Sequence, residues 1–339
     1  MSGFKILTFF CLMAAMYANA QTTVVTMTTT NDSVRILVKW TGDGDIISNS
    51  VVLKNNAFNI IAATADGLVL LTATGDVQVD NLFCHENSLT ALDVTNCPKL
   101  KWLGCDLNSL TTLDVTNCSM LIELYCDYNS LTALDVSNCP ELTGLNCARN
   151  SLTSLDVTHC PKLTRLACSS NLLTTLDVTN SLELLNLSCG SNLLTTLDVT
   201  NCTKLRDLGC SDNSLSTLDV ANCKELEGLY CSNNFFTTLD VTNCPKLRYM
   251  SACFQSPVLP VAVPKHTELS VKSPITFIGG EVSINRISHG GKYNAGDIIW
   301  SVSGESGEVK FEFSTKLPEG VSGIPFKGTV KQPWTKIIY

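Results

Sequence analysis

Cysteines are the residues of this chain whose type could do chemistry. They fall on two ladders, each with a step of 21 residues. The first ladder consists of Cys84, Cys105, Cys126, Cys147, Cys168, Cys189, Cys210 and Cys231. The second ladder consists of Cys97, Cys118, Cys139, Cys160, Cys202, Cys223 and Cys244, with Ser181 at its one gap. Thiols can ligate metals, form disulfides or act as nucleophiles. Each of these roles requires a particular spacing, with which the spacing of the cysteines can be compared.

The spacing argues against all three roles. The intervals between cysteines alternate between 13 and 8 residues, so the chain lacks the C-x-x-C pair that is typical of zinc sites. In-register side chains on parallel strands point the same way, whereas a disulfide needs them to turn toward each other. His85 and His159 stand alone, without partners at ligand spacing. We therefore predict buried thiols that pack as small apolar side chains, with no metal, cofactor or catalytic residue.

A 21-residue unit explains the two ladders. Residues 100–120 read LKWLGCDLNSLTTLDVTNCSM, and their apolar positions recur in every unit with few changes. The alternation Leu103-Gly104-Cys105 has the period of a strand, and the unit is too short and too punctuated for a helix of normal length. Each unit is expected to form a short strand, a corner, an extended return path and a second corner. One such coil cannot fold alone, so the units must stack.

Two polar positions repeat with the coil. The first position holds Asn87, Asn108, Asn129, Asn150, Asn171, Asn192, Asn213 and Asn234. An Asn amide can both donate and accept hydrogen bonds at a corner, so we interpret this column as an internal ladder and not as a ligand site. The Asp of each Leu-Asp-Val triplet, from Asp93 to Asp240, is interpreted as a corner cap. A calcium ladder is the weaker interpretation, because the calcium-binding β-roll pattern is glycine-rich with a nonapeptide period.

The pattern L-x-x-L-x-C-x-x-N-x-L-x-x-L-D-V resembles that of bacterial leucine-rich repeat proteins, and within them the internalin-like, cysteine-ladder type. The Asn-Cys-Pro corner is similar to repeats of secreted proteins from Bacteroidetes-type bacteria. The second ladder departs from the family, in which an Asn-like corner residue is usual. The resemblance implies a mainly β, curved leucine-rich repeat solenoid with 21-residue coils and a parallel sheet on its concave face. It also implies a binding role at a cell surface.

The first 20 residues have the features of a signal peptide. Lys5 precedes an apolar stretch, and Ala18-Asn19-Ala20 provides a cleavage site of small residues. No later stretch is apolar for the roughly 18 residues that a membrane-spanning helix needs. We therefore expect a secreted or cell-surface protein without a transmembrane segment. Exported proteins usually pair their thiols, so we hypothesise that burial and an oxygen-free habitat together keep the ladders reduced.

The rest of the chain divides into four predicted segments. They are a β cap over 21–78, a solenoid of eight Cys-ladder repeats over 79–253, a Pro-rich connector over 254–264 and a C-terminal β domain of unassigned role over 265–339. A cap is expected because the first coil of a solenoid otherwise exposes its core and its strand edge. The two flanking β domains are predicted from alternating β-branched residues that are separated by Gly-rich turns.

The repeat block is acidic. Residues 79–253 carry 19 acidic and 10 basic side chains, and the whole chain has a formal charge of −8. Nucleic acids and anionic membranes attract basic surfaces. The charge therefore argues against both of these partners.

The positions beside the inner Leu and Cys of each coil are expected to face solvent and to form a binding surface. The predicted ligand-binding residues are Trp102, Tyr125, Tyr128, Asp106, Glu123, Asp127, Tyr230 and Tyr249. Exposed aromatic side chains on a rigid sheet are typical binding anchors. The alternative is that the aromatic side chains cover a twisted sheet or pack against the N-terminal cap, which is the role expected for Phe83.

Three functions remain open. The leading hypothesis is a secreted module that binds a protein ligand, with adhesion to a host or cell surface as its role. A glycan-binding module is an alternative, because aromatic rings beside carboxylates also suit sugar rings. A structural arm that displays residues 265–339 is another. An enzyme is the weakest candidate, because the sequence contains no G-x-S-x-G, H-E-x-x-H or P-loop motif.

Overall fold

The computed structural model describes residues 22–252, Gln255 and, between 268 and 335, the residues of eight further strands. The chain divides into two compact units, with the boundary between Leu163 and Thr164. The predicted signal peptide and, apart from Gln255, the predicted connector lie outside the described residues. No helix long and apolar enough to cross a membrane is found in the part of the chain that is described.

The first unit begins with two antiparallel sets of strands. They are β1 (Thr22–Thr29), β2 (Ser33–Thr41), β3 (Ile46–Ser48), β4 (Val51–Val52), β5 (Ala57–Ala62), β6 (Leu68–Ala73), β7 (Gln78–Phe83) and β8 (Leu89–Asp93). One sheet has the order β4-β3-β6-β1-β8, and a second begins with β5-β2-β7. Alternation along β2 buries Val34, Ile36 and Val38 while Ser33 and Arg35 stay exposed. These strands therefore have a core of their own.

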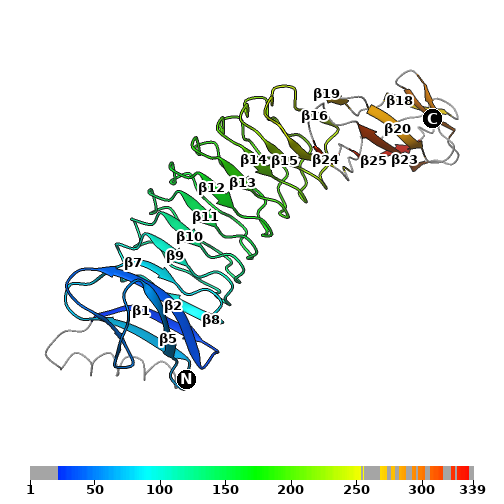
Figure 1. Ribbon diagram of the computed structural model, residues 1–339. Helices are drawn as coiled ribbons and strands as arrows, with labels where there is room; N and C mark the ends of the chain where they lie inside the picture. The colour runs from blue at the N-terminus through cyan, green and yellow to red at the C-terminus, as the bar shows by residue number, and fades with distance from the viewer. Residues whose placement is uncertain are drawn as a thin grey trace. The chain divides into compact units, whose positions relative to one another are not determined.

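The second sheet continues from β7 directly into the coils of the first unit. Strands β9 (Trp102–Gly104), β10 (Glu123–Tyr125) and β11 (Gly144–Asn146) follow β7 in parallel and in register (Figure 1). Hydrogen bonds between coils extend past these short strands, since the Cys105 N–H donates to the Tyr125 carbonyl at 2.8 Å. Each coil therefore depends on its neighbour for its backbone hydrogen bonds.

The second unit repeats the same coil. Its parallel, in-register strands are β12 (Arg165–Ala167), β13 (Asn186–Ser188), β14 (Asp207–Gly209), β15 (Gly228–Tyr230) and β17 (Tyr249–Ser251). In β12 to β15 the central Leu and the Cys that follows the strand point inward, as at Leu187 and Cys189, and in β17 Met250 and Ala252 take these two places. The predicted leucine-rich repeat solenoid with 21-residue coils and a parallel sheet is confirmed.

The ladder cysteines are all buried thiols, as predicted. Thiols of the second ladder approach backbone carbonyls of the preceding coil, for example Cys118 Sγ to Val94 O at 3.8 Å. A thiol is small, apolar and only a weak donor, so it fills a tight corner without demanding a strong partner. Ser181, which fills the gap in this ladder, is equally buried at 2% exposure.

The Asn column forms the predicted internal ladder. Asn192 Nδ2 donates to the carbonyls of Cys168 and Cys189, both at 3.0 Å, and its Oδ1 accepts from the Leu173 N–H at 3.0 Å. One amide thus satisfies backbone groups of its own coil and of the coil before it. Asn87 makes the same kind of contact to β2, with its Oδ1 accepting from the Arg35 N–H at 2.7 Å. The ladder therefore ties the first coil to the N-terminal strands.

The Leu-Asp-Val carboxylates are corner caps, as interpreted from the sequence. Asp114 accepts from the Thr116 N–H at 2.9 Å and from Thr116 Oγ1 at 2.6 Å. These bonds hold the pKa of Asp114 below its ordinary value. The corner that follows is a tight turn in which the Leu121 N–H donates to the Cys118 carbonyl at 3.0 Å, as the Leu100 N–H does to the Cys97 carbonyl in the coil before it. Pro98 suits the second position of such a turn because its φ is already fixed.

Strands from the C-terminal part of the chain pair with the last coils of the second unit. These strands are β18 (Glu268–Lys272), β19 (Thr276–Ile278), β20 (Val282–Ile287), β21 (Lys292–Asn294), β22 (Asp297–Ser301), β23 (Ser306–Thr315), β24 (Ser322–Ile324) and β25 (Lys327–Thr335). Strand β19 pairs with β16 (Thr238–Asp240) and β24 pairs with β17, both in parallel. The other strands form two antiparallel sheets, β18-β22-β21 and β20-β23-β25.

The Asn ladder runs one step further than the sequence pattern indicates. Gln255 lies 21 residues after Asn234, and its Nε2 donates to the Cys231 carbonyl at 2.9 Å while its Oε1 accepts from the Phe236 N–H at 3.2 Å. The repeat pattern missed this step because Gln replaces Asn and Ala252 replaces the ladder cysteine. The sequence period had been expected to end at the start of the connector.

The Asn ladder predicts a large difference between two asparagines of the second unit. Asn192→Ala would remove a partner of the Leu173 N–H and of three carbonyls, so the free energy of unfolding is expected to fall by about 2–4 kcal/mol. Asn201 is exposed and makes one bond, to the Thr179 carbonyl at 3.2 Å. Asn201→Ala is therefore the matched control, with a loss under about 1 kcal/mol. Urea unfolding measures both values, and equal losses would contradict the ladder's role.

Candidate functional site

The candidate site of the first unit lies on the outer face of the sheet β5-β2-β7-β9-β10-β11. Leu82 and Leu103 are fully buried, so their strand neighbours project from the other face of the sheet. Strand pairing sets Leu37 of β2 opposite Phe83 and sets Asn81 beside Trp102. Outward side chains of the N-terminal strands and of the coils therefore share one continuous surface.

Three of the predicted residues come from adjacent strands and differ in exposure. Trp102 is 42% exposed on β9, whereas Tyr125 on β10 is half-buried. The Tyr125 hydroxyl donates to Glu123 Oε2 at 3.0 Å, and Thr143 Oγ1 donates to Glu123 Oε1 at 2.9 Å. Glu123 was expected to face solvent, and this expectation is wrong. The two bonds hold its carboxylate against neighbouring side chains, and the residue is only 5% exposed. Glu123 thus holds Tyr125 in place.

Asp106 and Asp127 lie just after neighbouring strands and are both half-buried. Partial burial raises the pKa of Asp127, and the charge of Asp106 raises it further. The two carboxylates therefore repel each other at the edge of the surface. A cationic group of a ligand would relieve this repulsion.

Tyr128 is held by its backbone and by a cation. It has φ 52° and is 46% exposed, and the Arg149 guanidinium lies 4.8 Å from the centre of its ring. The same left-handed position recurs in each coil, at Glu86, Leu107, Tyr128, Arg149, Ser170, Ser191, Asp212 and Asn233. Non-glycine residues adopt this conformation at a cost, so each side chain leaves the coil in a fixed direction.

The three aromatic residues Trp102, Tyr125 and Tyr128 and the two carboxylates Asp106 and Asp127 are together called the aromatic surface.

Phe83 takes the packing role that was expected of it. A Cβ built on Gly104 would lie 2.6 Å from Phe83 Cδ1, so the Phe83 ring occupies the space that a side chain at 104 would need. Gly104 is therefore small because Phe83 covers it. Phe83 also pairs with Leu37 of β2, so it joins the N-terminal strands to the first coil.

The second unit has its own, smaller aromatic pair. The rings of Tyr230 and Tyr249 have centroids 5.2 Å apart and are tilted by 33°, and the two residues are 40% and 41% exposed. Nearby, Asn186 Nδ2 donates to Asp207 Oδ2 at 2.9 Å. A Cβ on Gly228 would lie 2.5 Å from Asp207 Oδ1, so this glycine leaves room for the carboxylate.

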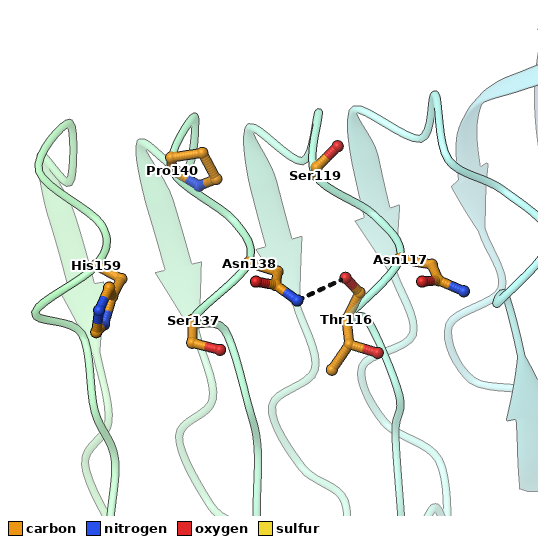
Figure 2. Close-up of a pocket in the computed structure, with 7 residues that line it drawn as sticks. All are labelled: Thr116, Asn117, Ser119, Ser137, Asn138, Pro140 and His159. Atoms are coloured by element: carbon orange, nitrogen blue, oxygen red, sulfur yellow. Dashed lines mark hydrogen bonds between the residues drawn. The ribbon is translucent and has the colours of Figure 1, made fainter.

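A polar pocket of about 480 Å³ opens at the Asn-Cys corners of the first unit. Figure 2 shows its lining residues on three successive coils, with Asn138 Nδ2 donating to the Thr116 carbonyl at 3.2 Å. His159 is its one titratable side chain and is exposed, with Nδ1 3.2 Å from Thr158 Oγ1. A single imidazole in this pocket has no second catalytic group among the lining residues.

The thiols also carry no chemistry in the folded state. Burial raises the pKa of Cys84 and of Cys189 to about 12, so both stay protonated at neutral pH. Only the thiolate is a good nucleophile or metal ligand. Within the described residues, no three His, Cys, Asp or Glu side chains are grouped so that they could hold a metal ion.

These coils form a leucine-rich repeat solenoid with a cysteine ladder. The chain is similar to the functional domain of InlJ from Listeria monocytogenes, whose structure includes a cysteine ladder. The two are 27% identical with a TM-score of 0.51, and the match covers 75% of this chain and 66% of that one. The chain thus spans just under two thirds of the length of that structure.

Other comparisons add less. A family model described as LRR adjacent matches residues 279–335. The Leptospira interrogans LRR protein LIC12759 is 22% identical over 52% of this chain and 62% of its own, with a TM-score of 0.35. The plant peptide hormone receptor RGFR1 in complex with RGF2 is 26% identical over 49% and 30%, with a TM-score of 0.43. No curated protein matches the chain.

The raised thiol pKa values predict that the protein loses stability in alkali. A buried thiol keeps its proton up to about pH 12, whereas the same thiol in the unfolded chain loses it near pH 8.5. Its contribution is therefore complete below pH 8.5 and is lost as the pH rises toward 12, at about 1.4 kcal/mol per pH unit for each thiol. Urea unfolding at a series of pH values should show this steep fall.

The control for the alkaline prediction is a variant with one thiol fewer. Cys189→Val keeps an apolar side chain at this position, so its unfolding free energy should fall less steeply with pH than that of the wild type. Comparing slopes removes the contributions of Lys and Tyr titration, which are common to both proteins. Identical slopes, or a flat profile above pH 9, would contradict the burial of neutral thiols.

Proposed function

We propose that the chain is a secreted or surface-exposed leucine-rich repeat protein that binds a protein ligand through the aromatic surface of its first unit. Adhesion to a host or cell surface is the role we infer, and we infer that the protein is not an enzyme. The observation that carries the proposal is the exposure of Trp102 and Tyr128 beside a Tyr125 that is fixed by Glu123.

The chemistry of this surface suits a protein ligand. Trp and Tyr dominate the binding energy of protein interfaces, since they bury much apolar area and lose few degrees of freedom. The backbone at Tyr128 and the bond between Tyr125 and Glu123 fix two of the three rings before binding. Such preorganisation lowers the entropic cost of association. Asp106 and Asp127 add a preference for a basic residue of the ligand.

The resemblance, the predicted signal peptide and the acidic repeat block support the cellular role. The predicted leader over residues 1–20 would direct export, and the charge of −9 over residues 79–253 disfavours nucleic acid and anionic membranes. The fold displays side chains on the outer face of a sheet. These features support a binding protein whose ligand lies outside the cell.

Carbohydrate is the second candidate ligand. The support for it is the pair Tyr230 and Tyr249, whose exposed rings lie 5.2 Å apart beside polar side chains. Sugar rings stack on such faces. A structural arm that displays the C-terminal strands is the remaining alternative, and it predicts that neither aromatic group is used.

The test is binding of purified residues 21–339 to immobilised panels of surface proteins and of polysaccharides. The triple variant Trp102→Ala, Tyr125→Ala, Tyr128→Ala should weaken retention on the protein panel by at least about 100-fold, since interface anchors each contribute about 2 kcal/mol or more. The variant Tyr230→Ala, Tyr249→Ala should leave that retention unchanged.

A third variant controls for general loss of apolar surface. Leu182 is 55% exposed and lies away from the strands, so Leu182→Ala should bind as the wild type does. Retention on polysaccharide that depends on Tyr230 and Tyr249 would favour the glycan candidate instead. Retention that survives the triple variant, or no retention on either panel, would overturn the proposal and favour the structural arm.

A further inference from the structure

The polar pocket of the first unit lies where the coils depart from their own repeat. The corner position just before the second cysteine ladder holds Asn in every coil but one, where it holds His159. Ser137 stands in a column that is Thr in most coils, and Ser119 stands in a column that is Pro in half of them. These three residues line the pocket together with Thr116, Asn117, Asn138 and Pro140 (Figure 2). The departures therefore gather at one place.

The hydrogen bonds around His159 determine which ring nitrogen can accept. Thr158 Oγ1 donates its only proton to Asp156 Oδ1 at 2.6 Å. His159 Nδ1 lies 3.2 Å from the same Oγ1, so Nδ1 has to be the donor in that contact. In the neutral ring, Nε2 then carries the lone pair. The imidazole therefore offers the pocket an acceptor.

Two asparagines add acceptors to the same lining. Asn117 Nδ2 donates to the Thr95 carbonyl at 3.2 Å. Asn138 Nδ2 donates to the Thr116 carbonyl at the same distance. Each carboxamide thus turns its nitrogen toward the preceding coil and its Oδ1 toward the next one, as Figure 2 shows. Thr116 Oγ1 gives its proton to Asp114 Oδ1 at 2.6 Å, so it can only accept a further bond.

Carboxylates behind the lining add negative charge. Asp114, Asp135 and Asp156 each accept a bond from the hydroxyl group two residues later, and these bonds hold the pKa of each carboxyl below its ordinary value. All three are therefore ionised at neutral pH. No Lys or Arg side chain is among the residues that line the pocket. Fixed negative charge beside acceptors attracts a cation and repels an anion.

We propose that this pocket binds a primary ammonium group. An ammonium has three N–H donors and no acceptor, so it matches His159 Nε2 and the Oδ1 atoms of Asn117 and Asn138. Bonds from a charged donor are also stronger than those from a neutral one. A neutral hydroxyl or amide would bring its own oxygen next to the lining acceptors and leave that oxygen unpaired. A phosphate or carboxylate would be repelled by the three carboxylates.

The pocket also has room for the group that carries the ammonium. Its volume of about 480 Å³ exceeds what an ammonium needs, so part of the attached chain or ring enters as well. Pro140 offers this part an apolar contact. A lysine side chain and an amino sugar both present the same ammonium chemistry. The pocket uses none of the residues of the aromatic surface, so it does not depend on the ligand of that surface.

Ligand-observed NMR titration of residues 21–339 with n-butylammonium tests the proposal, and n-butanol is the neutral probe of the same size. A dissociation constant of about 1–10 mM is expected for so small an amine, with the alcohol at least about tenfold weaker. The imidazole ¹⁵N signals of His159 should shift with the amine, because Nε2 accepts one of its bonds. Titrations with glucosamine and with Nα-acetyl-lysinamide then distinguish an amino sugar from a lysine side chain.

Restoring the repeat provides the matched variant. His159→Asn, Ser137→Thr and Ser119→Pro together give this corner the commonest residue of each column, so circular dichroism should show a folded protein. This repeat-restoring variant should bind n-butylammonium at least about tenfold more weakly. His85→Asn removes an exposed histidine that does not line the pocket, so it should bind the amine as the wild type does. Equal binding of amine and alcohol, amine binding that the repeat-restoring variant retains, or no shift at His159 would overturn the proposal.

Discussion

The structure depends on the hydrogen bonds that each coil receives from the next. Three-residue strands are too short to be stable alone, so the backbone bonds between coils and the Asn side chains that reach across them hold the sheet together. Asn192, for example, serves backbone groups of its own coil and of the previous one. These bonds form only if every coil places its backbone groups and its Asn in register with those of the next coil. Every coil must therefore have the same length, which here is 21 residues.

The same constraint explains both the cysteines and the freedom of the outer face. Inside, a coil has little room, and a thiol fills two positions per coil without requiring a strong partner. Outside, the positions flanking the central Leu meet only their neighbours in the sheet, so they can vary from glycine to tryptophan. Where they vary, the changes are coupled: Gly104 accommodates the Phe83 ring, and Gly228 accommodates the Asp207 carboxylate. The binding surface is thus built on a frame that does not change with its side chains.

Much of the fold could be predicted from the sequence, because the same residue pattern recurs in every coil. The Asn ladder, the Asp caps and the neutral thiols follow from residue chemistry at fixed spacing. The step at Gln255 was missed, since a single substituted copy at the end of an array has no periodic support. The pairing of β16 and β17 with C-terminal strands was also out of reach, because it joins residues far apart in the sequence.

The site was harder to predict than the fold. Spacing placed Trp102, Glu123 and Tyr125 on one surface, but it could not show that Glu123 turns inward to bind Tyr125 and Thr143. The contact of Arg149 with Tyr128 depends on a left-handed backbone position that no glycine marks. The exposed residues of β5 were not singled out, because alternating apolar residues in a strand normally indicate a buried face. Exposure at an edge depends on which strands are its neighbours, and that is a property of topology.

The most direct test of the central claim compares two deletions in the second unit. Removing residues 186–206 takes out one whole coil and keeps the register, whereas removing 187–206 takes out one residue fewer and shifts every later coil. Reaction of native protein with a thiol reagent reports the outcome, because the ladder thiols are buried. Register-dependent stacking predicts that the whole-coil deletion stays unreactive and folded while the shorter deletion exposes its thiols. Equal reactivity of the two proteins would contradict it.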